Sequence, residues 1–149
     1  MVTSPPWLNT VESVTRKAMS TQRHGEAKGK VRIEIVRVYD DPGHQGDYRA
    51  LVDRLWPRGI KKSELLMDEW AKDLAPSSVL RTWYGHDPKR FATFARRYRR
   101  ELAVDPVAQR VDRLRQIAVV RQLILLTATR DLEHSGATVL REVIAGLTQ

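Results

Sequence analysis

Three stretches of the chain have the hydrophobic pattern of β-strands. Apolar and polar residues alternate in VRIEIVRV (31–38), with a change of phase at Ile35 and Val36, and a period of two predicts a strand. The run YRALV (48–52) predicts a second, short strand that ends before Pro57 and Gly59, because proline cannot donate to a sheet. The run QLILLTAT (122–129) is almost continuously apolar, which is typical of a strand covered on both faces.

Helices are expected between and after these strands. Helix-start signals and apolar spacings of three and four predict helices over 63–70, from Pro76, from Asp87-Pro88, from Asp105-Pro106 and over 131–147. The third of them has an apolar stripe made of Phe91, Phe94, Ala95, Tyr98 and Leu102.

This order of elements predicts a small α/β domain. We expect a largely parallel sheet with helices on both faces, in three layers, formed by residues 31–149 as a single domain. Residues 1–30 are rich in Ser, Thr, Pro, Gly and Lys, so we expect a disordered N-terminal extension. A chain of 149 residues buries roughly 70% of its unfolded surface and needs no cross-links.

Composition narrows the classes of protein. The chain has no cysteine, which excludes disulfides and thiolate chemistry, and its most apolar run (123–128) is too short to span a bilayer. We therefore expect a cytoplasmic protein without a membrane partner. The 26 basic and 18 acidic residues give a net charge of +8, which favours anionic ligands or nucleic acid as partners.

The strand ends carry the candidate site. If the strands at 48–52 and 122–128 are parallel neighbours, Asp53-Arg54 and Arg130-Asp131 emerge at one edge of the sheet, where α/β proteins bind ligands. Arginine grips carboxylates and phosphates, so we predict a pocket for a small anionic ligand. The predicted ligand-binding residues are Arg54, Arg58, Lys72 and Arg130, and the candidate acid–base residues are Asp53, Asp73, His86, Asp131 and His134. In the alternative interpretation, Asp53, Arg54, Arg130 and Asp131 form ion pairs that only hold loops together.

Signatures of known chemistry are absent from the sequence. There is no dinucleotide fingerprint, P-loop, nucleophile elbow or HExxH motif, so no metal site is predicted and neither a cofactor nor a reaction is indicated. The aromatic residues Trp56, Trp70, Trp83 and Tyr84 are expected to fill the core rather than to wall a cleft. The oligomeric state is not indicated.

The basic helix predicted over 88–102 offers a second function. Its residues Arg96, Arg97, Arg99 and Arg100 suit phosphate contacts, which would make this a nucleic-acid-associated or regulatory protein. Tyr98 lies on the apolar stripe, however, and a charged outer face is also what any solvated helix shows. We therefore rank nucleic-acid binding second.

Four runs together resemble one bacterial family. The runs are VDRLWPRG (52–59), DEWAKDLAPSS (68–78), LRTWYGHDPKRFATFARRYRREL (80–102) and LLTATRDLEHSGATVL (125–140). Together they resemble domain-of-unknown-function family 488, the uncharacterised YeaO-like cytoplasmic proteins, over roughly residues 33–147. The resemblance implies a small soluble α/β protein without an established reaction. Members usually have His-Asn with a second histidine one position further on, and here only His134 matches, since Ser135 and Gly136 follow it.

Overall fold

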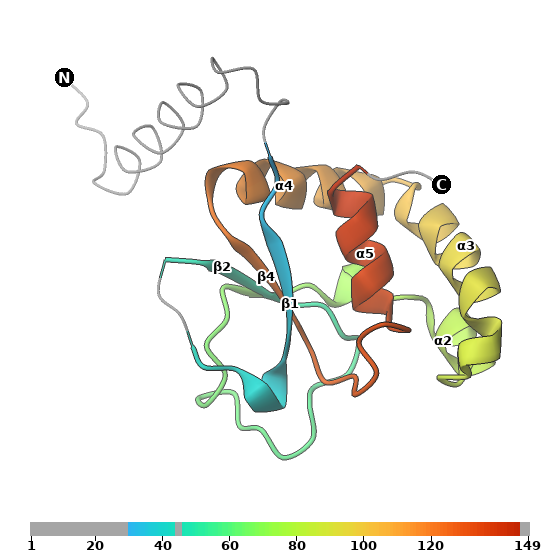
Figure 1. Ribbon diagram of the computed structural model, residues 1–149, viewed down its shortest axis with the longest axis horizontal. Coiled ribbons are helices and arrows are strands. Elements are labelled where there is room, and N and C mark those ends of the chain that lie inside the picture. The colour runs from blue at the N-terminus through green and yellow to red at the C-terminus, as the bar shows by residue number, and fades with distance from the viewer. Residues whose placement is uncertain (1–29, 44–45, 147–149) are drawn as a thin grey trace.

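The computed structural model describes residues 30–43 and 46–146, and the predicted N-terminal extension, apart from Lys30, lies outside them (Figure 1). The strands are β1 (Ile33–Arg37), β2 (Tyr48–Leu51), β3 (Glu69–Trp70) and β4 (Leu123–Thr127). The α-helices are α2 (Ser78–Tyr84), α3 (Phe91–Leu102), α4 (Val107–Val120) and α5 (Gly136–Ile144). Three single turns of 3-10 helix are η1 (Val38–Asp40), η2 (Lys72–Leu74) and η3 (Pro88–Arg90).

The described strands form one parallel sheet in the order β1-β4-β2-β3. The central strand β4 is buried along all five residues, which confirms the strand expected from its apolar run. Its Leu125 pairs with Ile35 of β1 and with Ala50 of β2. The second strand and the central strand are therefore parallel neighbours, which is the condition for the predicted site, and their carboxyl ends lie together.

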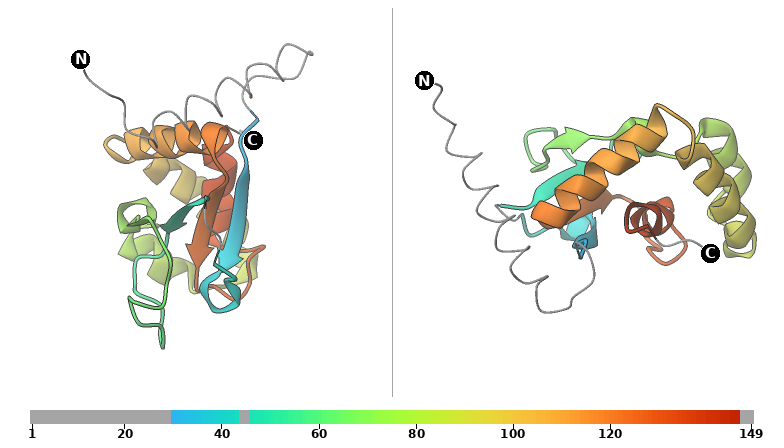
Figure 2. Two further views of the ribbon diagram at one scale, coloured as in Figure 1. Left: turned by 90° about the vertical axis from the view of Figure 1, so that its left-hand side faces the viewer. Right: turned by 90° about the horizontal axis from the view of Figure 1, so that it is seen from above.

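The two faces of the sheet have different covers. Leu123, Leu125 and Ala50 belong to a core that contains the buried side chains of α2 to α5, whereas Ile124 and Leu126 belong to a second core on the opposite face. Figure 1 shows α2, α3 and α5 on one side of the strands, and Figure 2 shows α5 between the strands and α3. The α/β class and the parallel sheet are confirmed, but α2 to α5 do not lie on both faces as expected.

The second face is covered by a loop. Trp56, Ile60, Leu65 and Met67 pack there against the sheet. The helix predicted over 63–70 is wrong, because this segment forms turns and then pairs with β2 as strand β3. Its apolar residues pack against the sheet from a loop, so their spacing does not indicate a helix.

A buried arginine fixes this loop. Arg49, only 2% exposed, forms an ion pair with Asp41, and its Nε donates to the carbonyl of Leu66 at 2.6 Å. The carboxylate of Asp68 accepts a hydrogen bond from the backbone N–H of Arg49 at 2.8 Å. Segments on both sides of β2 are thereby tied to one side chain.

The helices begin largely where capping residues place them. Ser77 caps α2, and its own N–H and hydroxyl are both accepted by the carboxylate of Glu101 from α3. Asp87 caps η3 ahead of α3, as the Asp-Pro signal predicts. The last helix starts at Gly136 with Ser135 as its cap, so the expected start at Asp131 is wrong.

Candidate functional site

A cavity of about 530 Å³ lies at the carboxyl ends of β2 and β4. Its lining comes from Tyr39 of η1, residues 52–58 after β2, residues 75–76, α2 and the turn after it, α3, residues 127–131 at and after the end of β4, and residues 135–137 at the start of α5. The charged and titratable side chains among the described lining residues are Asp53, Arg54, Arg58, Arg81, His86, Arg130 and Asp131, besides tyrosines. This is the sheet edge at which the sequence predicts an anion pocket.

Asp53 bridges the ends of the two strands. One carboxylate oxygen accepts the hydroxyl of Thr127 at 2.7 Å, and the other accepts the backbone N–H of Ala128 at 2.7 Å. Burial raises the pKa of Asp53 and outweighs these two hydrogen bonds, which lower it. The backbone carbonyl of Asp53 also accepts the indole N–H of Trp70 at 2.7 Å. Asp53 therefore stabilises the strand ends as well as lining the cavity.

Arg54 is held by backbone carbonyls. Its Nε donates to Pro76 at 3.2 Å, and one terminal nitrogen lies 3.5 Å from the carbonyl oxygen of Ala75. A guanidinium has five N–H donors, so these two contacts leave others for a ligand. Among the described residues, Arg54 forms no ion pair with Asp53 or Asp131, which does not support an interlocked charge cluster.

Three exposed arginines complete the charged lining. They come from separate segments: Arg58 follows β2, Arg81 lies on α2, and Arg130 follows β4. Within the part of the chain that the structure describes, none of the three is joined to an acid by an ion pair. No carboxylate of the described residues therefore neutralises the charges of these three arginines through an ion pair.

The two candidate histidines lie in different surroundings. His86 lines the cavity in a left-handed conformation, with φ of 56°, directly after Gly85 at the end of α2. The Nδ1 of His134 lies 2.8 Å from the carboxylate of Asp131, and this hydrogen bond lowers the pKa of Asp131. The ring of His134 packs edge-on against Phe91 and is not part of the lining.

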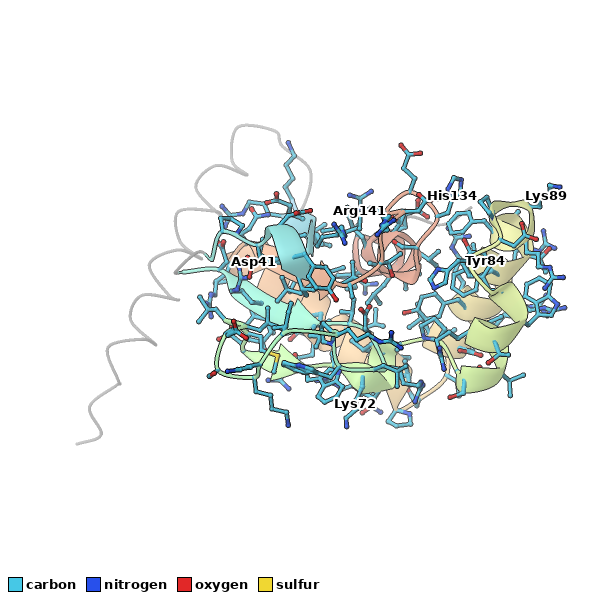
Figure 3. All side chains as sticks on the ribbon, turned by 90° about the horizontal axis from the view of Figure 1, so that it is seen from below. Asp41, Lys72, Tyr84, Lys89, His134 and Arg141 are labelled. Atoms are coloured by element: carbon cyan, nitrogen blue, oxygen red, sulfur yellow. The ribbon has the colours of Figure 1, made fainter. Side chains whose placement is uncertain are left out.

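Two more of the predicted site residues, besides His134, lie outside the cavity lining. Lys72 sits over the ring of Trp70, with its Nζ 4.2 Å from the ring centroid, and Asp73 accepts from Arg110 of α4 at 2.9 Å. Figure 3 shows Lys72 well apart from Tyr84 and His134. Both residues follow β3, so their side chains meet α4 and Trp70 instead of the cavity.

The comparisons with known proteins identify the family. Residues 32–149 match the family described as the inactive DUF488-N3 subclade. The chain belongs to this family. It is 42% identical over 118 residues to the uncharacterised protein YeaO of Escherichia coli K12, a match that covers 78% of this chain and 100% of YeaO. It is 40% identical over 117 residues to the uncharacterised protein Rv3073c of Mycobacterium tuberculosis H37Rv, which covers 78% and 97% of the two chains. No solved structure matches the chain.

The predicted resemblance to the DUF488 and YeaO-like proteins is therefore confirmed. Each of the four runs on which that resemblance depends contributes to the cavity lining, for example through Arg58, Pro76, Arg81 and Arg130. The first and the last of these runs are far apart in the sequence, and all four contribute to the cavity at the carboxyl ends of the strands.

The arginines of α3 in this DUF488 chain lie outside the cavity lining. Arg99 forms an ion pair with Glu142 of α5 at 2.5 Å, and Arg97 stacks over the ring of Trp83 at 4.5 Å from its centroid. Arg96 donates to Thr93 at 3.3 Å, and Arg100 is exposed. Two of the four are therefore engaged in packing α3 against its neighbours.

The aromatic residues divide between packing and lining. Trp56 and Trp70 pack edge to face at 5.3 Å, Trp83 is half-buried beneath arginines, and Tyr84 is buried. Trp56 and Tyr84 also line the cavity, so packing and lining are not exclusive alternatives.

Some of the residues that line the cavity were not predicted from the sequence. Arg81 was not predicted, although it lies three residues before Tyr84 and so shares a helix face with it. Thr127 was missed because its side chain appeared to be one more member of an apolar strand. In the described residues there is no group of three His, Cys, Asp or Glu side chains placed to hold a metal ion, and no helix long and apolar enough to cross a membrane.

Proposed function

We propose that this DUF488 chain binds a small anionic ligand in the cavity at the carboxyl ends of β2 and β4. The observation that carries the proposal is the convergence of four arginines, from three separate segments, on one cavity of about 530 Å³ among the described residues: Arg54, Arg58, Arg81 and Arg130. Protein cavities that bind small molecules are commonly of this size, and in α/β proteins they lie at this edge of the sheet.

The charge balance of the lining supports an anion. The lining contains two aspartates among the described residues, and both already have partners in the protein: Asp53 binds Thr127 and Ala128, and Asp131 binds His134. Like charges brought together without counter-ions repel one another, and a bound anion relieves that repulsion. Guanidinium groups also bind carboxylates and phosphates through paired, charge-assisted hydrogen bonds.

Binding is favoured over turnover. Both oxygens of Asp53 accept hydrogen bonds from the protein, and His134 packs against Phe91 outside the cavity lining. Neither candidate is therefore presented to the cavity as a free general base. The description of the matched family as inactive also supports a binding role.

The test is a thermal-shift titration with phosphate, pyrophosphate and citrate. A ligand at a hundredfold excess over its Kd adds about 2.7 kcal/mol of stability, which is a shift of several degrees. We expect a shift for the wild-type protein that Arg58→Gln and Arg130→Gln each strongly reduce. The matched control is Arg100→Gln, which removes the same charge from an exposed position outside the cavity lining.

The result also separates the second function considered from the sequence. A shift that survives Arg58→Gln and Arg130→Gln places the anion elsewhere and contradicts the proposal. If oligonucleotides bind instead, and Arg96→Gln, Arg97→Gln and Arg100→Gln abolish this salt-dependent binding, the surface of α3 is the functional one.

A further inference from the structure

We infer that the ligand is an extended anion with two separate acidic groups, each held at a different end of the cavity. This inference rests on the proposed function and names the class of its ligand. The positions of the cavity arginines along the edge of the sheet support it.

The cavity extends across the carboxyl ends of neighbouring strands. Tyr39 of η1, which directly follows β1, lines it on one side, and α2 lines it on the other through Arg81 and Tyr84. Because β1 and β2 pair with opposite edges of β4, their ends are separated by two strand spacings, about 10 Å. Figure 1 shows the cyan turn η1 and α2 on opposite sides of the end of β4.

Arg58 belongs to the η1 end of the cavity. The hydroxyl of Tyr39 donates to the backbone carbonyl of Arg58 at 2.8 Å, which ties this segment to η1. The side chain of Arg58 is exposed and lines the cavity, and no carboxylate in the described part of the chain forms an ion pair with it. Arg58 therefore offers one acidic group a cation at this end.

Arg54 and Arg81 belong to the α2 end of the cavity. Arg81 lies within α2, and the Nε of Arg54 donates to the carbonyl of Pro76, which directly precedes the cap of that helix. Arg130 follows the central strand β4 and so lies between the two ends. The charged lining therefore offers cations at both ends and one in the middle.

A single small anion leaves part of this lining unbalanced. The four arginines outnumber the two aspartates of the described lining by two charges, and one acidic group is too small to contact both ends. A cavity of about 530 Å³ also has the size of sites that hold ligands much larger than phosphate or acetate. When two acidic groups share one molecule, the second contact becomes intramolecular, which raises affinity by about a hundredfold or more.

A series of carboxylates tests the inference by calorimetric titration of the full chain at neutral pH. The long diacids adipate and suberate are compared with malonate, which carries two charges on a shorter chain, and with hexanoate, which has the carbon chain of adipate but one carboxylate. We expect the better of the two long diacids to bind at least about tenfold more tightly than malonate and hexanoate, with one molecule per chain. Malonate controls for charge, and hexanoate controls for the apolar chain.

Variants at the two ends locate the effect. Arg58→Gln and Arg81→Gln should each reduce the affinity for the long diacid to about that for hexanoate, because each removes the cation at one end. Hexanoate needs only one end, so at least one of the two variants should leave its affinity within about twofold of the wild-type value. Arg100→Gln is the matched control, since Arg100 is exposed and lies outside the cavity lining.

The failures of the two proposals are distinguishable. A smaller preference for the long diacids, or one that Arg58→Gln and Arg81→Gln leave intact, overturns the two-ended ligand, and the anion site still stands if Arg130→Gln abolishes the binding. Binding that survives all three variants, or no binding of any diacid, phosphate or pyrophosphate, overturns both proposals.

Discussion

Removal of the Asp53 carboxylate tests how the site is supported. In Asp53→Ala the partly buried backbone N–H of Ala128 loses its acceptor, at a cost of about 1–3 kcal/mol. The hydroxyl of Thr127 also loses a partner but retains Thr129 at 3.2 Å, so its share is about 1 kcal/mol. We expect a total destabilisation of roughly 2–4 kcal/mol, or a decrease in Tm of roughly 10 °C.

The assay is urea and thermal unfolding followed by circular dichroism at neutral pH. Asp112→Ala is the matched control, because it removes an exposed carboxylate whose ion pair with Arg115 lies within one turn of α4. That change should cost less than about 1 kcal/mol. If Asp53→Ala is as stable as Asp112→Ala, the carboxylate does not hold the strand ends together, and the structural role assigned to it is refuted.

The pH dependence of stability tests the raised pKa of Asp53. Since burial raises its pKa above the ordinary 3.8, the folded protein binds a proton there more tightly than the unfolded chain does. Stability from this group is present below the ordinary value and is lost as the pH rises through the raised one. The stability of the wild-type protein relative to Asp53→Asn should therefore increase as the pH falls from neutral to the ordinary value of 3.8. A difference that is constant over this range contradicts the raised pKa.

Three further predictions concern the residues that position the site, each checked by urea unfolding. Arg49→Ala leaves the buried carboxylate of Asp41 unpaired and should cost about 3–5 kcal/mol, and a cost below about 1 kcal/mol would contradict this role. Gly136→Ala places a methyl group in ordinary van der Waals contact, 3.4 Å from both Pro76 and the ring of Tyr98, and alanine loses less backbone entropy than glycine in a helix, so we expect a gain of up to about 1 kcal/mol, and a loss of about 1 kcal/mol or more would show that these contacts are too tight. Glu101→Gln weakens the acceptor for the N–H and hydroxyl of Ser77 and should cost about 1 kcal/mol, whereas a Ser77→Ala background should abolish most of that effect.

The elements with a regular pattern were predictable from the sequence. The buried residues of α3 recur at helical spacing, and every residue of β4 is buried. The hydrophobic pattern of each segment therefore predicts its secondary structure. The site prediction was conditional on β2 and β4 being parallel neighbours, and because they are, Arg54 and Arg130 lie at one edge of the sheet. The geometry between strand ends is the part of the candidate site that sequence reasoning can supply.

The remaining differences come from tertiary contacts. Leu65 and Met67 pack as a loop on the second face of the sheet, and a loop on a flat surface imposes no period on its sequence. Asp131 and Ser135 are both good capping residues, and the structure uses Ser135 for α5 while Asp131 binds His134. Choosing between them requires the position of Gly136 against Tyr98, which no local pattern contains.

Arg54 has a different role from the other arginines of the cavity. Its guanidinium donates to Pro76 and lies near the Ala75 carbonyl, so it holds the segment before α2 at the strand ends while it presents its remaining donors to the cavity. Arg58 and Arg130 are exposed, and within the described residues no acid pairs with them. If the proposed function is right, replacing Arg54 should therefore change stability and anion binding together. Replacing Arg58 or Arg130 changes the charge of the cavity alone, and for that reason the binding experiments depend on these two residues.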